Sequence, residues 1–431
     1  MPDETARLGK ETGRSAGRIG IFLLIAIGLG YVLTVVWGRV LDPADNKVFL
    51  SFWGVLMGLG AALSPLEQEI SRQSAHAALE GAKAGKPAVR AFTVCAVLVL
   101  LFCLLTLIPP VTQRLYGGHW EFAVIVLAGG VSFAFQFAAR GLLIGQHRIR
   151  PYSWLIMAEA LVRVLLLGVL LVAGLAQLVP LALAAAAGSF AWLLFARQAG
   201  RLVDPGLEGE ALRPVAVRIV TLMAGAGLTA SVITGYPAMV SLLGPSGEDD
   251  RIGVLFLALF VARTPLMLLS PIQAIAVPTV VRLSGTADGP RRLRRLLSVG
   301  ALAALVLAAA GALVGFLIGP WVVELLYTAK NRPEGWWMAG LVWSSVLLTA
   351  IQLAAAVLVA QAKANKVLLT WAVVAATSAL VLLFLPGDAV FRAVAGLALG
   401  PTLGLAVVLV FVLRVTPSAG NSKAGSRVPL V

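Results

Sequence analysis

The chain has 431 residues, of which 59% are hydrophobic and 13% charged, and its mean hydropathy is +0.94. Soluble domains hold about 45–50% apolar and about 25% charged residues, so this composition excludes a soluble globular protein. The formal net charge is +14, but most of the basic residues gather on one side of the predicted membrane helices, so the charge requires no nucleic-acid partner.

Long apolar stretches follow one another along nearly the whole chain. A spanning helix needs about 20 mostly apolar residues, and the sequence therefore predicts an all-α integral membrane protein with about twelve transmembrane helices. Basic residues precede the first stretch and no small-residue cleavage site follows it, so we expect an uncleaved first helix. The predicted helices are 19–37, 48–66, 89–109, 121–145, 152–175, 178–196, 215–243, 252–281, 296–319, 336–361, 367–385 and 390–413.

The loop charges orient these helices. With the N-terminus in the cytoplasm, 24 of the 34 basic residues lie in or beside inward segments and seven in outward ones. This bias is the one that Lys and Arg show in cytoplasmic loops. We therefore expect a multi-pass membrane protein with both termini in the cytoplasm.

The sequence repeats itself weakly. Residues 63–66 (LSPL) resemble 269–272 (LSPI), and residues 143–146 (LIGQ) resemble 358–361 (LVAQ). The two offsets are similar, which indicates two six-helix halves. An even number of helices per half makes the repeat parallel, with its axis along the membrane normal.

The predicted organisation follows from this repeat. Residues 1–196 form an N-terminal six-helix lobe and residues 215–415 a C-terminal one. The polar segment 197–214, which contains Gly and Pro, reads as the cytoplasmic linker between them. Residues 416–431 are expected to form a disordered cytoplasmic tail.

Arg263 lies about eleven residues into the predicted eighth helix, near the middle of the membrane. Pro265, Pro271 and Pro278 follow it, and each proline removes a backbone donor and can bend the helix. Such breaks are tolerated where the backbone is buried in protein or lines a wet cavity. The pattern indicates an anion site with a kinked gate; the alternative is a structural Arg that bonds carbonyls freed by Pro265.

Acidic residues occur in the fifth predicted helix and at the end of the second. Glu159 and Arg163 are spaced i, i+4 in the fifth helix and are expected to neutralise each other. Two interpretations stay open: a pair that fixes packing, or a cavity switch in which protonation of Glu159 frees Arg163. Glu67 and Glu69, beside Arg72, are expected to be solvated at the cytoplasmic interface.

Arginines also recur near the predicted cytoplasmic helix ends. Side chains at such positions usually reach toward the interface and anchor the helix. One or two of them could instead form a basic vestibule for the phosphate of an anionic lipid. These residues are Arg18, Arg140, Arg218 and Arg282.

No pattern for a catalytic site, a cofactor or a metal is present. Cys95 and Cys103 share one apolar helix and are expected to be buried, reduced thiols. The three histidines fall in three different loops, which excludes zinc-ligand spacing. Two glycine series, 311/315/319 and 396/400/404, are typical of close helix packing.

Several segments resemble the polysaccharide flippases of the multidrug/oligosaccharidyl-lipid/polysaccharide (MOP) exporter superfamily, especially actinobacterial examples. The resemblance extends over nearly the whole chain. The segments that carry the resemblance are ALSPLEQEISR at 62–72, RGLLIGQ at 140–146 with EALVR at 159–163, and ARTPL at 262–266 with PIQAIAVP at 271–278. Residues 319–320 leading to 326–327 also look like the turn after the ninth helix of the family.

The resemblance implies two MATE-like six-helix lobes that form a V, with alternating access around a cationic cavity. In lipid II flippases of the superfamily, arginines of helices 1, 2 and 8 are expected to hold the diphosphate. Arg263 matches the helix 8 position and Arg18 weakly matches helix 1, whereas helix 2 has no Arg in its apolar span. The two additional C-terminal helices of those flippases are also absent, which favours another polyprenyl-linked sugar.

The sequence and this resemblance therefore predict a flippase or exporter of polyprenyl-phosphate-linked sugars in a bacterial plasma membrane. Its expected partners are the lipid bilayer and glycosyltransferases of the same pathway. Arg263 would be the main phosphate contact. The first alternative is a cation-coupled multidrug antiporter of the same fold, which needs buried carboxylates, of which Glu159 is central. The second is a lipid-phosphate glycosyltransferase that uses Asp42 and Asp45 in the first outward loop.

Overall fold

A computed structural model of the chain describes residues 2–207, 210–264, 289–360 and 363–413. Pro265, Pro271, Pro278, Arg282 and the tail 416–431 lie outside the described residues. The described elements of the first half are α1 (Pro2–Val40), α2 (Pro43–Ala62), α3 (Ser64–Leu79), α4 (Lys86–Thr106), α5 (Pro109–Tyr116), α6 (Trp120–Gly145), α7 (Ile149–Val172), α8 (Leu178–Ala187), η1 (Gly188–Phe195) and α9 (Ala196–Gly200). Those of the second half are α10 (Leu212–Ile233), α11 (Tyr236–Leu243), α12 (Asp249–Ala262), α15 (Gly289–Leu326), η2 (Ala329–Asn331), α16 (Gly335–Ala360), α17 (Ala364–Phe384) and α18 (Ala389–Leu413).

Within these ranges, 11 helices are long and apolar enough to cross a membrane. They correspond to every predicted stretch except 252–281, of which the structure describes α12 and the residues up to 264. The prediction of an all-helical, multi-pass membrane protein is therefore confirmed.

The second predicted helix is longer than expected and interrupted. α2 ends at Ala62, Leu63 lies between the two segments, and α3 continues to Leu79. The prediction that this helix ends at residue 66 was wrong because Pro65 falls in the first turn of α3, where its missing N–H costs no helical hydrogen bond. Hydropathy also misses the polar half of α3, whose Leu66 and Ile70 are nevertheless buried.

The predicted helix 215–243 is likewise two helices. α10 ends at Ile233, and α11 starts at Tyr236 with Pro237 in its first turn. The backbone of the break packs closely on α2: a Cβ added to Gly54 would lie 3.2 Å from the carbonyl oxygen of Thr234. Glycine at position 54 therefore lets the broken helix approach α2.

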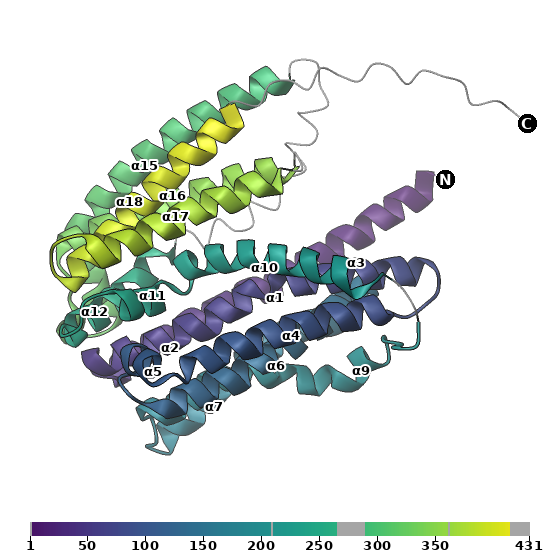
Figure 1. Cartoon of the computed structure of the whole chain (residues 1–431), viewed down its shortest axis with the longest axis horizontal. Coiled ribbons are helices and arrows are strands. Elements are labelled where there is room, and N and C mark those ends of the chain that lie inside the picture. Colours follow the sequence, from purple (N-terminus) through teal and green to yellow (C-terminus); the bar gives the residue numbers. More distant parts are fainter. Residues whose placement is uncertain (1, 208–209, 265–288, 361–362, 414–431) are drawn as a thin grey trace, which may run out of the picture.

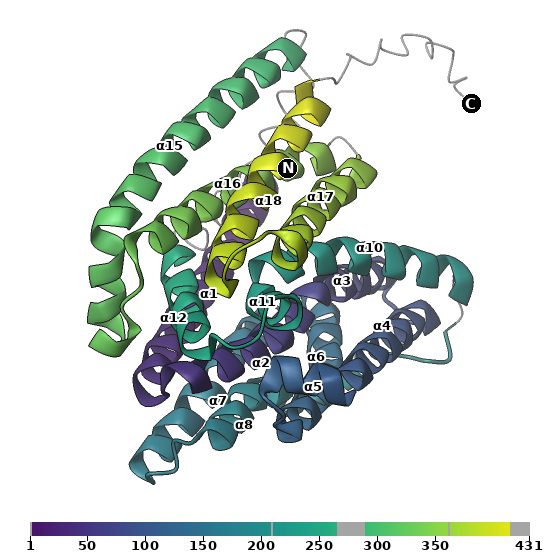
Figure 2. The same cartoon turned by 60° about the vertical axis from the view of Figure 1, so that its left-hand side comes forward.

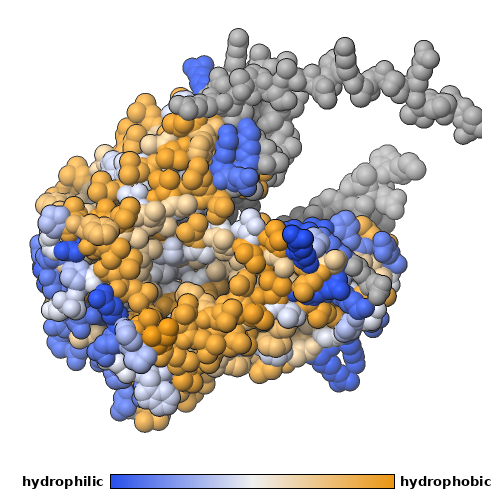
Figure 3. Space-filling model, in the orientation of Figure 1, coloured by the Kyte–Doolittle hydropathy of each residue, from blue (hydrophilic) through white to orange (hydrophobic). Residues whose placement is uncertain are grey.

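The helices form two diverging groups. In Figure 1, α15 to α18 make the upper group and α1 to α7 with α9 the lower one, while α10, α11 and α12 lie between them. The groups converge on the left, near α11 and α12, and separate toward the end where α1 begins and α18 ends; Figure 2 shows the same separation of α15–α18 from α4–α6. The space-filling view in Figure 3 is hollowed between the two groups and mainly apolar over both.

Both predicted glycine series pack helices within the fold. A Cβ on Gly319 of α15 would come within 2.7 Å of the Met338 side chain of α16, and one on Gly315 within 3.1 Å of the Met338 carbonyl oxygen. On α18, a Cβ on Gly400 would lie 2.9 Å from the Val374 carbonyl oxygen of α17. These contacts confirm the prediction of close helix packing.

Candidate functional site

Arg263 is buried where α10, α11 and α12 meet. It follows the last residue of α12, and its side chain is 5% exposed. Its Nη2 donates to the carbonyl oxygen of Val232, 2.7 Å away, at the end of α10. Its Nε has no hydrogen-bond partner, and no described carboxylate lies within ion-pairing distance. The guanidinium therefore keeps unused donor capacity and a positive charge that its described surroundings do not neutralise.

Tyr31 of α1 and Tyr236 of α11 lie near Arg263. The Tyr236 hydroxyl donates to the carbonyl oxygen of Ala393 in α18, 2.7 Å away, so this contact links α11 to the C-terminal helices. Segments from both halves thus surround one buried cation. Burying an unpaired charge is costly in a protein interior, which singles out Arg263 as a candidate anion contact.

The predicted Glu159–Arg163 pair is present, at 2.8 Å between Oε1 and Nη2. Arg140 of α6 also forms an ion pair with Glu159, and Gln136 Nε2 donates to Oε2 at 2.7 Å. Glu159 is therefore held by two arginines and an amide. The position of Arg140 differs from the expected vestibule, because packing of α6 on α7 directs its side chain to this buried carboxylate.

Arg163 lies deep inside the N-terminal helices. Its Nε donates to the carbonyl oxygen of Ala185 at 2.9 Å, and its guanidinium lies over the ring of Trp53. A Cβ on Gly188 would lie 2.5 Å from Arg163 Nε, so the glycine makes room for this side chain. These contacts favour the packing interpretation of the pair, and a role of Glu159 and Arg163 as a switch stays a prediction.

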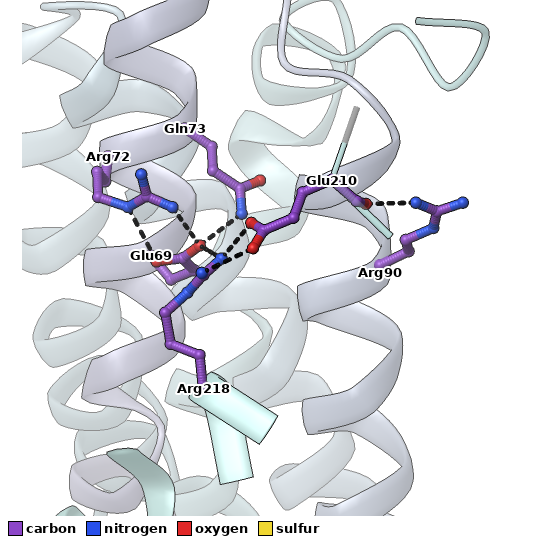
Figure 4. A network of polar contacts seen from close by, with 6 residues as sticks. All are labelled: Glu69, Arg72, Gln73, Arg90, Glu210 and Arg218. Carbon is purple, nitrogen blue, oxygen red and sulfur yellow. Dashed lines mark hydrogen bonds and ion pairs between the residues drawn. The ribbon is translucent and has the colours of Figure 1, made fainter. Parts of the chain in front are cut away.

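Arg218 belongs to a polar network between the linker and three helices (Figure 4). Its Nη2 lies 2.7 Å from Glu69 Oε1 and 2.6 Å from Glu210 Oε2. Arg72 and Gln73 also donate to Glu69, and Arg90 of α4 donates to the Glu210 backbone carbonyl. Its described carboxylate partners thus occupy Arg218, which leaves it less suited to phosphate than predicted.

Glu69 is 4% exposed, so the expectation of a solvated carboxylate was wrong. Glu69 lies on a face of α3 that packs against neighbouring helices. One of these is α10, which carries Arg218, 149 positions later in the chain, to the Glu69 carboxylate. Glu67 is also withdrawn from solvent and accepts a hydrogen bond from the Tyr152 hydroxyl, 2.8 Å away. The hydrogen bonds from Arg218 lower the pKa of the Glu210 carboxyl in the linker.

The remaining predicted site residues lie outside the described part of the structure. Arg18 belongs to α1, but its side chain is not described. Pro265, Pro271, Pro278 and Arg282 follow the last described residue of the eighth predicted helix. Among the described contacts, Arg263 shares no hydrogen bond or ion pair with the Glu159 cluster or the Arg218 network.

Contacts between the two halves close the end of the molecule where α1 ends and α2 begins. Arg39 at the end of α1 donates to the carbonyl oxygens of residues 325 and 326 of α15, at 3.0 and 2.7 Å. Lys47 pairs with Asp249 at 2.5 Å, and Asn331 Nδ2 donates to the Gly38 carbonyl oxygen at 3.1 Å. The structure is therefore joined at this end and hollow at the other (Figure 3).

Comparison with known sequences gives relatives over almost the entire chain. No family model matches. An uncharacterised protein of Mycobacterium tuberculosis is 28% identical over 419 residues, which cover 94% of both chains. A second uncharacterised protein of the same species is 29% identical over 413 residues, which cover 91% of this chain and 90% of the relative.

Solved structures share the architecture at low sequence identity. An inward-facing multidrug resistance MATE transporter of the MOP superfamily matches with a TM-score of 0.64 and 16% identity, covering 89% of this chain and 93% of the other. A MOP transporter of Pyrococcus furiosus matches with a TM-score of 0.57 and 16% identity, covering 92% of this chain and 95% of the other. That transporter is described as having a binding pocket of reverse polarity, which suggests a different function. A lipid II flippase in an inward closed conformation matches with a TM-score of 0.56 and 11% identity, covering 91% of this chain and 87% of the other. The chain is therefore an all-helical, multi-pass membrane protein with the fold of MATE-like transporters of the MOP superfamily.

Proposed function

We propose that the protein is a flippase that moves a polyprenyl-phosphate-linked sugar or oligosaccharide from the inner to the outer leaflet of a bacterial plasma membrane. The observation that carries this proposal is the buried guanidinium of Arg263, which has an unpartnered Nε and no described carboxylate in ion-pairing distance. A cation at the meeting point of both halves suits a phosphate, because charge-assisted hydrogen bonds to phosphate oxygens are among the stronger polar contacts.

The acidic residues support the same choice. Glu159 is held by Arg140 and Arg163, and Glu69 by Arg72 and Arg218. A site that exchanges organic cations for protons or sodium needs a carboxylate that is free to bind them. Neither of these two carboxylates meets that requirement, whereas the positive charge of Arg263 is available to an anion.

Alternating access supplies the mechanism. The hollow at the end of the termini would admit the phosphate and sugar, while the hydrocarbon chain stays in the bilayer (Figure 3). Release to the other side then requires the contacts made by Arg39, Lys47 and Asn331 to break. An anionic head group that moves outward gains about 2.3 kcal/mol per charge per 100 mV of inside-negative potential, so ATP is not needed.

The relatives support the location and leave the sugar open. Two mycobacterial relatives of nearly full length are consistent with an actinobacterial cell envelope. The absence of an Arg in the apolar span of α2 separates the chain from the expected lipid II site and favours a different carrier, such as a monophosphate. Glycosyltransferases that assemble the carried sugar would be its partners in the pathway.

A cation-coupled antiporter is the second candidate, and one residue favours it. Glu67 is mostly withdrawn from solvent, and the Tyr152 hydroxyl is its hydrogen-bond donor at 2.8 Å. Unlike Glu69 and Glu159, it forms no described ion pair within 4.0 Å. Glu67 is therefore the buried carboxylate best suited to take up a proton or sodium ion in such a transporter.

Proteoliposomes distinguish the two candidates. We expect the purified protein to increase the rate at which a membrane-impermeant reagent modifies labelled polyprenyl-phosphate sugar from the inner leaflet. This increase should persist without a proton or sodium gradient. Protein-free vesicles are the control for spontaneous flipping. Gradient-driven dye efflux that Glu67→Gln abolishes, together with no lipid flipping, would overturn the proposal in favour of antiport.

A further inference from the structure

A groove of about 560 Å³ lies between the N-terminal helices and the broken helix α10–α11. Its volume is within the usual range of about 300–1,000 Å³ for small-molecule sites. The walls come from the second halves of α2, α4 and α10, and from the short helices α5 and α11. With the predicted orientation, the groove extends from the middle of the membrane to the outer interface.

Apolar side chains and glycines line the groove. Its two hydroxyl-bearing residues are satisfied locally: Thr106 donates to the Cys103 carbonyl oxygen at 2.7 Å, and Ser231 donates to the Leu228 carbonyl oxygen at 2.8 Å. The groove therefore offers no free side-chain donor and suits a hydrocarbon occupant. Its mouth is open to the bilayer, since Phe102 is 46% exposed on α4.

Glycines line two walls of the groove: Gly54 and Gly58 of α2 and Gly227 of α10. Gly54 and Gly58 lie against the break at residues 234–235, whereas a Cβ on Gly227 would meet no atom within 4 Å. The missing side chain of Gly227 therefore leaves empty space beside α10. This added width suits a methyl-branched chain, which is broader than a linear acyl chain.

A cation stands at the outer rim. Arg114 of α5 lies beside Leu115 and donates to the carbonyl oxygen of Leu242, 2.7 Å away; both leucines line the groove. Its described partner is this neutral carbonyl, whereas Lys47, Arg251, Lys330 and Arg332 at the same end each pair with a carboxylate. Arg114 thus offers its charge to an anionic head group whose chain occupies the groove.

We propose that this groove is a binding site for the isoprenoid chain of a polyprenyl-phosphate lipid in the outer leaflet, with the phosphate at Arg114. The inference rests on the proposed flippase function and adds a second lipid site, separate from Arg263. The break at residues 234–235 lies next to both lipid sites. Gly235 lines the groove, and Arg263 donates to the carbonyl oxygen of Val232, just before the break. A lipid that has crossed can therefore be held on the outer side before it leaves.

The test uses the full chain in nanodiscs and a polyprenyl monophosphate with a photoactivatable group near the end of its chain. We expect labelled peptides from α4 and α10 around Phe102 and Met223. Gly227→Phe fills the space and should lower this labelling about tenfold, the effect of losing the burial of a few isoprenoid carbons. Gly168→Phe on α7 is the matched control, because a Cβ there also meets no atom within 4 Å.

A second variant tests the head-group contact. Arg114→Gln keeps a donor for the Leu242 carbonyl oxygen but removes the charge, so it should weaken labelling by the phosphate-bearing probe and not by the neutral polyprenol. Equal labelling of wild type and Gly227→Phe would show that the groove holds ordinary boundary lipid and would overturn the inference. The same conclusion would follow if phosphatidylglycerol reduced the labelling as strongly as unlabelled polyprenyl monophosphate does. Groove labelling without flipping would refute the proposed function alone, and flipping without groove labelling would refute the groove alone.

Discussion

Arg263 carries a positive charge into the protein interior, where the described residues provide a carbonyl and no carboxylate. The α10–α11 break supplies that carbonyl because the helix ends at Ile233 and leaves late carbonyls available. Arg263 therefore satisfies a late carbonyl of α10 through Nη2, while its Nε has no hydrogen-bond partner. Under the proposed function, this spare donor binds the phosphate.

We expect Arg263→Met to leave the free energy of unfolding unchanged or to raise it by about 1–3 kcal/mol, because replacing a buried charge by a packed apolar group is often neutral or stabilising. Thermal unfolding in detergent measures this. Arg263→Lys is the control that keeps the charge. A marked loss of stability in Arg263→Met would show that the residue serves the fold.

Arg163 should behave in the opposite way. Arg163→Met leaves Glu159 with one arginine fewer in a buried site, and we expect a loss of about 3–5 kcal/mol. Removing both members in Glu159→Gln with Arg163→Met should recover part of that loss, which a double-mutant cycle measures. Additive effects of the two substitutions would contradict the packing interpretation.

At the scale of single elements, helix contacts depend on small residues and on the linker network. Gly319→Leu should cost about 1–3 kcal/mol, because its side chain would overlap Met338 of α16. Gly300→Leu, on the same helix, is the matched control, since a Cβ there meets no atom within 4 Å. Equal thermal stabilities of the two variants would contradict the described packing of α15 on α16.

The network of Figure 4 holds the inner end of α10 against α3 and α4. Glu69→Gln removes the charge shared by Arg72 and Arg218, so we expect faster hydrogen exchange in the first turns of α10. Glu80→Gln, at the exposed end of α3, is the control for loss of a carboxylate. Unchanged exchange in α10 would show that apolar packing alone holds this helix.

The sequence predicts contacts within one helix better than contacts between helices. The spacing of Glu159 and Arg163 identified their pair, because residues four apart share a helix face. Arg140 and Gln136 join that pair only through packing of α6 on α7, and Arg218 reaches Glu69 across 149 positions. Hydropathy located the spans, but it missed the extension of α3 and the breaks at Leu63 and residues 234–235, which depend on proline position and tertiary contacts.

At the scale of the whole molecule, the two halves are joined at one end and separated at the other (Figure 1). The predicted lobe boundary at 197–214 stays a prediction, because α10 packs against α2 and α4 as well as α17.

Transport by alternating access requires the closed end to open. We expect a thiol cross-link between Asp42→Cys and Lys330→Cys, which replace an ion pair between the halves, to stop flipping and a reductant to restore it. Cys95 and Cys103 are buried, which limits background reaction. Each single-cysteine variant is the control, and undiminished flipping in the cross-linked protein would contradict the opening of this end.

The proposed function depends on the binding of the lipid phosphate by Arg263. The most direct measurement compares flipping of a polyprenyl-phosphate sugar by wild type and Arg263→Met in matched proteoliposomes with equal amounts of folded protein. We expect rapid flipping by wild type and a loss of about 100-fold in the variant, as for removal of a charged hydrogen bond of about 3 kcal/mol. Equal rates for the two proteins would contradict it.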